Sequence, residues 1–301
     1  MSGTAQVAFN PLTWYFSSSG QFAPDDAPPL AHIYREIREA GFHAVHTEMP
    51  QDMSVDDYRR LLDDSGLAPA PGYFHTAFSD PARIPGAVEE AKRTAGHHAQ
   101  LGLSRIFIAD GFSDGPRRER PAQGADADAA RLDRIATAIG TVAEAMVAEG
   151  VTPCLHQHVG TWIETESETE AVLAAVDREL LLLGPDTGHL AWAGVDPARF
   201  IEKHLDRIGA VHLKDLHGAI RTEAFTESLD YFSAGARHLW TEPGRGDIDF
   251  DDVLDVLSRF DGWYVIEVDV ADQPTPRDTA TVSARWVSER LTGGHNDRVA
   301  S

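Results

Sequence analysis

The stretch Thr152–Gly160 reads TPCLHQHVG, a short apolar run that ends in two histidines separated by one residue. Successive side chains of a β-strand point to opposite faces, so His156 and His158 share a face if the strand extends that far. If the strand ends inside the motif, only one of the two needs to face inward. Imidazole is a common metal ligand and proton carrier near neutral pH. The motif therefore predicts either a site at a strand end or two loop histidines with ordinary hydrogen bonds.

Apolar runs suited to strands alternate with segments of helical spacing along the whole chain. The expected strands are Gln6–Asn10, Ala44–Thr47, Ala68–Phe74, Arg105–Ala109, the run from Thr152, Leu180–Leu183, Ala210–Leu213 and Trp263–Val268. The expected helices are Leu30–Ala40, Val55–Ser65, Ile84–Leu101, Ala125–Glu149, Glu166–Val176, Pro197–Leu205, Phe250–Phe260 and Asp278–Leu291.

Eight strands that alternate with helices predict a (β/α)8 TIM barrel, an α/β fold, as a single domain over residues 1–301. A doubly wound open sheet is the alternative, but its glycine-rich turn is missing after the first strand, where the chain reads Asn10-Pro11-Leu12-Thr13. Residues 216–249 are expected to form an insertion at the barrel rim after strand seven. Residues 111–124 are expected to be a loop or a lid, and residues 292–301 a frayed tail.

The composition narrows the class of protein. A hydrophobic content of 42% suffices for a large core, and a formal net charge of −22 argues against binding to nucleic acids or anionic membranes. Cys154 is the single cysteine and lies in an apolar run, so a core position is expected. The amino-terminal sequence lacks the pattern of a secretion signal, and no apolar run approaches the ~20 residues of a membrane span. A soluble, cytoplasmic protein is therefore expected.

Titratable side chains follow nearly every expected strand, at the end of a barrel where active sites are built. Chance in an acidic protein supplies some carboxylates, but it does not readily supply four histidines. Carboxylates and imidazoles that converge on one axis favour Mn²⁺ or Co²⁺, with Zn²⁺, Fe²⁺ or Mg²⁺ as alternatives, over the all-oxygen sites of Ca²⁺. The strand ends carry Asn10, Glu48, His75, Asp110, His156, His158, Asp186, His189, His212, Lys214, Glu267 and Asp269.

Five stretches carry a family resemblance: Leu155–Thr165, Pro185–Gly194, Val211–Asp215, Glu242–Phe250 and Gly262–Asp269, which read LHQHVGTWIET, PDTGHLAWAG, VHLKD, EPGRGDIDF and GWYVIEVD. The chain resembles the xylose isomerase-like superfamily of sugar isomerases and epimerases, and within it the inosose dehydratases. The resemblance implies that His156, Asp186, His212 and Glu267 are the metal ligands. Most of the superfamily has Glu at the position of His156, so His158 is an alternative ligand.

The loss of that Glu favours a reaction on one face of the substrate. The resemblance implies a metal-dependent lyase that removes a proton next to the ketone of a keto-inositol or keto-sugar and expels water or another β-leaving group. His158 is the expected base, with Glu267 second, and Lys214 or His189 the expected proton donor to the departing oxygen. The remaining roles stay open: Lys214 can instead pair with Asp215, and His189 can orient ligands. Glu48 and His75 are expected to contact hydroxyls or to be structural, and Trp14 and Trp192 to form apolar walls or ordinary packing.

Two other functions remain alternatives. A ketose isomerase or epimerase uses the same scaffold, and a barrel without catalytic activity can bind a sugar or scaffold a subunit. The substrate is expected to be a keto-cyclitol or keto-sugar. The aromatic segment Phe225–Trp240 lies on the rim, where it can close over substrate, pack against a second copy or partner subunit, or do both.

Overall fold

The computed structural model describes residues 5–17 and 19–292. Its parallel strands form two sheets, with the strand orders β3-β2-β1-β11-β8 and β4-β5-β6-β7. The strands are β1 Gln6–Phe9, β2 Ala44–His46, β3 Ala68–Ala70, β4 Tyr73–Thr76, β5 Arg105–Asp110, β6 Thr152–Leu155, β7 Leu182–Leu183, β8 Ala210–Leu213 and β11 Trp263–Ile266.

The two sheets adjoin at two places. At one, the strand predicted over Ala68–Phe74 is divided into β3 and β4, because Pro71 has no N–H for a ladder and Gly72 passes close to Thr47. A Cβ on Gly72 would lie 2.4 Å from the Thr47 carbonyl oxygen. At the other, parallel bridges join Leu183 to Ile208 and Asp186 to His212. The strands therefore continue from one sheet into the other at both junctions, as the barrel prediction requires.

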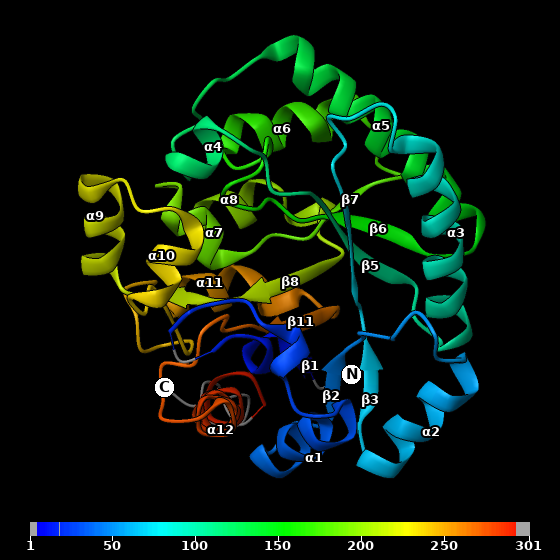
Figure 1. Ribbon diagram of the computed structural model, residues 1–301, viewed down its shortest axis with the longest axis vertical. Coiled ribbons are helices and arrows are strands. Elements are labelled where there is room, and N and C mark those ends of the chain that lie inside the picture. The colour runs from blue at the N-terminus through cyan, green and yellow to red at the C-terminus, as the bar shows by residue number, and fades with distance from the viewer. Residues whose placement is uncertain (1–4, 18, 293–301) are drawn as a thin grey trace.

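Helices surround the strands, as Figure 1 shows. The helix predicted from Ala125 begins at Ala129, because the Asp128 side chain caps it by accepting the N–H groups of Ala130 and Arg131. After α12 the chain continues as a π-helix over Ser288–Thr292. The surrounding helices are α1 Leu30–Ala40, α2 Val55–Ser65, α3 Ile84–Gln100, α5 Ala129–Ala148, α6 Glu166–Ala175, α8 Pro197–Lys203, α11 Phe250–Val256 and α12 Pro276–Val287, with 3-10 turns at Pro11–Tyr15, Pro24–Asp26, Leu205–Arg207 and Leu257–Arg259.

The loops at the carboxyl ends of the strands contain elements that periodicity did not predict. A short helix, α4 Pro116–Glu119, lies within the predicted loop 111–124, and α7 Thr187–Trp192 follows β7 directly. The predicted insertion 216–249 folds into α9 and α10, which lie on the side toward which β8 points in Figure 1. The tail predicted from 292 lies outside the described residues beyond Thr292. The insertion elements are β9 Asp215–Leu216, α9 Gly218–Glu227, α10 Tyr231–Ala236 and β10 Trp240–Thr241, with β9 and β10 antiparallel.

Side chains alternate between the barrel interior and the helix layer. In β8, Ala210 joins the small residues of the interior, whereas Val211 and Leu213 pack against the helices. His212 therefore points inward. Cys154 is a free, buried member of the interior cluster, so its predicted core position is confirmed. Among the described residues, no helix has the length and apolarity needed to cross a membrane.

Candidate metal and substrate site

Three buried side chains converge at the carboxyl end of the barrel. Asp186 follows β7, His212 lies in β8 and Glu267 follows β11, and each offers a ligand atom within 4.8 Å of those of the other two. His212 Nδ1 lies 3.3 Å from Glu267 Oε2 and 3.7 Å from Asp186 Oδ2. The strand-end pattern predicted this convergence from residues that are up to 81 positions apart in the chain.

Asp186 has two functions in the local structure. Its Oδ1 accepts the backbone N–H of His189 at 2.8 Å and caps the start of α7. Its Oδ2 is buried and has no hydrogen-bond partner in the described part of the chain. A buried carboxylate oxygen without a partner is costly, and a cation is a natural partner for it. The helix cap therefore fixes the direction in which the free oxygen points.

The two histidines of the HQH motif lie beyond the end of β6, which stops at Leu155. Both nevertheless line the same cavity. His156 forms a second possible ligand group with Asp186 and His189, and its ring centroid lies 4.8 Å from that of His212. His158 Nδ1 lies 2.8 Å from the Val159 carbonyl oxygen, so this nitrogen donates and Nε2 carries the lone pair. The geometry therefore groups His156, and not His158, with Asp186.

Lys214 lies buried beneath the cavity. Its Nζ is 2.5 Å from Glu267 Oε1 and 2.6 Å from Asp269 Oδ1, and it lies 4.6 Å above the ring of Trp240. The predicted alternative, an ion pair with Asp215, is wrong, because the carboxylate of Asp215 accepts backbone N–H groups of the turn at 244–248. The Tyr231 hydroxyl donates to the other oxygen of Asp269 at 2.5 Å.

Burial and charge divide the histidines into two kinds. Burial lowers the pKa of His212, but the carboxylates of Glu267 and Asp186 outweigh that effect and raise it to about 9. Burial and the neighbouring His212 hold the pKa of His156 well below its usual range, and burial and Lys214 lower that of His158 to about 3. Burial would raise the pKa of Glu267, but Lys214 and His212 hold it well below its usual range. His156 and His158 are therefore neutral at pH 7, with lone pairs available.

The cavity above these groups has a volume of about 550 Å³. Of the residues predicted at strand ends, eight line it: Asn10, Glu48, His75, Asp110, His156, His158, Glu267 and Asp269. Asp186, His189, His212 and Lys214 are not lining residues; they lie next to residues that are. Arg93 and His97 of α3 also line the cavity.

Neither tryptophan predicted as a cavity wall lines the cavity. Trp14 packs against Phe9, and its indole N–H donates to Glu36 of α1 at 2.7 Å, so its ring fills the space between β1 and α1. Trp192 is fully buried and stacks on Tyr231 with ring centroids 5.6 Å apart. It supports a lining residue instead of contacting the cavity itself.

The sequence did not predict several of the lining residues, among them His46, Tyr73 and Tyr231. His46 ends β2, is buried, and has its ring centroid 5.8 Å from that of His212. Its inward direction follows from alternation with Ala44, which belongs to the interior cluster. Tyr73 begins β4 beside the break at Gly72, and Tyr231 begins α10. Only the aromatic composition of the rim segment signalled Tyr231, and nothing in its spacing gave its direction.

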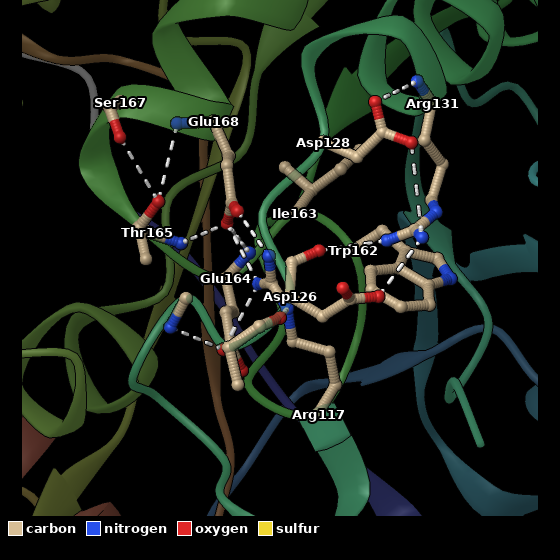
Figure 2. Close-up of polar contacts among 12 residues, drawn as sticks. Arg117, Asp126, Asp128, Arg131, Trp162, Ile163, Glu164, Thr165, Ser167 and Glu168 are labelled. Carbon is tan, nitrogen blue, oxygen red and sulfur yellow. Dashed lines mark hydrogen bonds and ion pairs between the residues drawn. The ribbon is translucent and has the colours of Figure 1, made fainter. Parts of the chain in front are cut away.

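A buried ion cluster fixes the loop after β5 to the loop after β6, as Figure 2 shows. Arg117 of α4 is buried and contacts Glu164 at 3.0 Å and Glu168 at 2.5 Å. Glu164 also accepts the backbone N–H groups of Ala122, Gly124 and Gly160. Residues 111–124 are thus an ordered segment held against the loop that carries His158.

The donor set fits a divalent cation of the Mn²⁺, Co²⁺, Zn²⁺ or Fe²⁺ type. His156 Nδ1, Asp186 Oδ2 and His212 Nε2 are buried without hydrogen-bond partners among the described residues. Mixed nitrogen and oxygen donors are typical of these ions. Asp186, His212 and Glu267 would bind the ion, with His156 as the fourth candidate.

A protein-family model, the xylose isomerase-like TIM barrel, matches residues 34–290, and the chain belongs to this family. The chain is 28% identical over 272 residues to the rhizopine catabolism protein MocC of Rhizobium meliloti, covering 88% of this chain and 81% of the relative. It is 27% identical over 283 residues to an inosose dehydratase of Bacillus cereus, covering 88% and 90%.

Solved structures share the fold at lower identity. The probable 3-DHS dehydratase AsbF of Bacillus anthracis superimposes with a TM-score of 0.73 at 16% identity, covering 95% of this chain and 99% of that one. A D-allulose 3-epimerase of a Methylomonas species gives a TM-score of 0.66 at 17% identity, covering 95% and 97%. The barrel is thus common to proteins named for elimination and for epimerisation, and the fold alone does not separate the two reactions.

Proposed function

We propose that the protein is a divalent-metal-dependent lyase that eliminates water, or another β-leaving group, next to the ketone of a keto-inositol or keto-sugar. The observation that carries the proposal is the buried group of Asp186, His212 and Glu267 beside a cavity lined by neutral histidines. The similarity to inosose dehydratases over 88% of the chain supports elimination over other chemistry on this fold.

His158 is the proposed base that removes the proton next to the ketone. Its Nδ1–H donates to the Val159 carbonyl, which fixes the ring and leaves the Nε2 lone pair for the substrate proton. Glu267 is the second choice, because its oxygens already contact Lys214, His212 and Asn10. A bound divalent cation would polarise the ketone and stabilise negative charge on its oxygen.

The departing oxygen needs a proton, which we assign to Lys214 or His189. Lys214 contacts Asp269, which lines the cavity and also accepts the Tyr231 hydroxyl. His189 accepts the backbone N–H of Val159 at Nδ1, so Nε2 carries its proton, and no described residue accepts it. Glu48 and His75 line the cavity and are proposed to orient substrate hydroxyls.

A ketose epimerase or isomerase is the second candidate. The family is named for an isomerase, and both reactions begin with a proton transfer next to a carbonyl, so the same residues could serve either one. Two-sided epimerisation needs a second base on the opposite face of the substrate. His156, in the strand-five position, is a candidate metal ligand, and an imidazole whose free nitrogen is spent on the metal cannot accept a proton. A sugar-binding barrel without activity is the third candidate.

Incubation in deuterated water separates these candidates. Protein loaded with Mn²⁺ or Co²⁺ is mixed with 2-keto-myo-inositol and, in parallel, with ketohexoses. The masses of the products are then measured by mass spectrometry. The proposed lyase gives a product lighter by one water. An isomerase or epimerase gives a product with the mass of the substrate, increased only by deuterium uptake. Deuterium uptake without loss of water would contradict the lyase assignment and favour the isomerase or epimerase. Stoichiometric metal with no turnover of these substrates or of any other keto-sugar would favour the binding function.

The two histidines of the HQH motif are expected to respond differently to substitution. His158→Asn keeps a donor to the Val159 carbonyl but removes the proposed base, so kcat should fall by roughly 10²–10⁴-fold with metal content unchanged. His156→Asn should instead lower the bound metal measured by elemental analysis. His204→Asn, which changes a histidine paired with Glu170 outside the cavity, is the control. If His158→Asn loses the metal and His156→Asn retains it, the two assignments are exchanged.

Glu48 is expected to give the activity an acid limb. Desolvation in the cavity raises the pKa of its carboxyl to about 6, and a hydrogen bond from Tyr15 opposes this only in part. A carboxyl with a raised pKa is protonated below that value, where it no longer accepts two hydroxyl hydrogen bonds. We expect kcat/KM to rise with pH through about 6 and to lose this limb in Glu48→Gln. A limb that persists in the variant would exclude Glu48 as its source.

A further inference from the structure

Five aromatic side chains form a collar along one wall of the cavity. They come from three segments that are far apart in the sequence: the loop after β1, the loop after β5, and α10 of the rim insertion. Figure 1 shows the first of these segments passing beside α10. The aromatic collar consists of Phe16, Phe22, Phe112, Tyr231 and Phe232.

The rings of the collar contact one another. Phe112 lies 5.2 Å from Tyr231 and 5.5 Å from Phe232, measured between ring centroids, and Phe16 lies 5.3 Å from Phe22 and 6.4 Å from Phe232. Tyr231 in turn rests on Trp192 and donates its hydroxyl to Asp269. The collar is therefore continuous with the groups beside the metal ligands, and it extends outward from them.

Two of these rings are exposed to solvent although they are apolar. Phe22 is 50% exposed and Phe112 is 46% exposed; among the described residues the third large hydrophobic side chain of this kind is Leu205, at 38%. Exposed apolar surface gathered at one cavity mouth indicates a ligand or a partner. The ion cluster of Arg117 holds the loop that carries Phe112, so the exposed ring belongs to an ordered segment.

Polar side chains also line the cavity. Glu48, His75, Arg93 and His97 line it and suit the hydroxyls of a sugar ring. A keto-cyclitol has hydroxyls around its whole edge and only the small C–H faces of one ring, which are too small to cover five aromatic side chains. A cavity of about 550 Å³ lies within the ~300–1,000 Å³ range that encloses drug-sized ligands. The preferred substrate should therefore carry an apolar, planar group beside its sugar ring.

We propose that this group is an aromatic aglycone, and that the protein cleaves a keto-glycoside whose leaving group is a phenol. The inference rests on the proposed lyase function and specifies its substrate. The base takes the proton from the carbon between the ketone and the anomeric carbon. The anomeric C–O bond then breaks, and its electron pair leaves with the aglycone oxygen, which takes up a proton. The products are an α,β-unsaturated keto-sugar and the free phenol, with no oxidant or reductant required.

Binding tests the collar separately from turnover. Titration calorimetry compares the affinities for phenyl β-D-glucoside and methyl β-D-glucoside. Neither compound has a ketone, so neither can undergo the elimination reaction. We expect the phenyl glucoside to bind at least about tenfold more tightly, equivalent to about 1.4 kcal/mol. Phe112→Ala and Phe22→Ala should remove most of that difference. Leu205→Ala, which truncates the exposed apolar residue outside the cavity, is the matched control and should retain it.

Turnover then tests the cleavage. The 3-keto derivatives of both glucosides are supplied to the metal-loaded protein, and phenol and methanol are measured by chromatography. The ratio of kcat/KM for the phenyl substrate to kcat/KM for the methyl substrate should be about tenfold lower in Phe112→Ala than in the parent protein. Phenol is intrinsically a better leaving group than methanol, but this difference is the same for both proteins and cancels when their ratios are compared.

Equal binding of the two glucosides would overturn the inference, whether or not keto-cyclitols lose water. Phe112→Ala or Phe22→Ala variants that change the molecular mass in solution without changing aryl binding would also overturn it, and would indicate that a second copy covers the collar. Collar-dependent aryl binding without turnover of any keto substrate would support the aryl ligand and overturn the lyase function.

Discussion

Asp186→Asn should abolish binding of the proposed metal ion and lower kcat by roughly a thousandfold, because a catalytic cation supplies several kcal/mol of transition-state stabilisation. The substitution removes one charge and retains the shape of the side chain. Asn is as good an N-cap as Asp, so its carbonyl oxygen can still accept the His189 N–H that starts α7. What is lost is the anionic Oδ2, the buried oxygen without a hydrogen-bond partner among the described residues. Metal content by elemental analysis and turnover of the keto substrate are the two measurements.

Asp196→Asn provides a control of the same chemistry. Asp196 caps α8 by accepting the N–H groups of Ala198 and Arg199, and it lies outside the cavity and the ligand groups. It should keep full metal content and turnover. If Asp186→Asn binds metal as tightly as the parent protein, the proposed site is wrong.

Arg117→Met is expected to lower the free energy of unfolding by about 3–5 kcal/mol, the usual loss when one partner is removed from a buried ion pair. Arg117 is 1% exposed and is the cation that balances Glu164 and Glu168. Methionine fills much of the same volume but leaves both carboxylates buried. It also removes the donor to the Ala125 carbonyl, which ties α4 to the rest of its loop. Denaturant titration measures the change.

Arg118→Met, at the neighbouring position, makes the same chemical change on an exposed side chain whose nearest carboxylate is 4.0 Å away. It should change stability by less than about 1 kcal/mol. Addition of Glu168→Gln to Arg117→Met should recover part of the loss, because one buried charge is then removed. Equal stability of the two Arg variants would mean that the cluster does not hold the loop.

The barrel and the floor of the site could be predicted from the sequence because both depend on alternation. In β8, side chains alternate between two faces: Val211 and Leu213 point outward and are buried against the helices, so His212 between them points into the barrel. The division of the third strand could not be predicted in the same way, because it depends on how closely Gly72 passes Thr47, two residues that are remote in the sequence.

Directions of side chains in loops were the least predictable. Trp14 and Trp192 follow strand ends, as site residues do, but Trp14 donates to Glu36 and Trp192 packs beneath Tyr231. Their positions in the sequence predicted that they lie near the site, but not the direction in which their rings point. The exposed ring of Phe112 likewise depends on the ion cluster of Arg117, whose partners come from another loop.

The ammonium of Lys214 between Glu267 and Asp269 has a practical meaning for biochemists. With a protonated His212 beside it, this internal cation already compensates most of the negative charge at the barrel mouth. Chelation should therefore yield a folded apoprotein and not a denatured one, with a melting temperature lowered only by the loss of the metal-binding free energy. One preparation can then be reconstituted in turn with manganese, cobalt, zinc and iron, which ranks the ions by turnover without a confounding difference in folding.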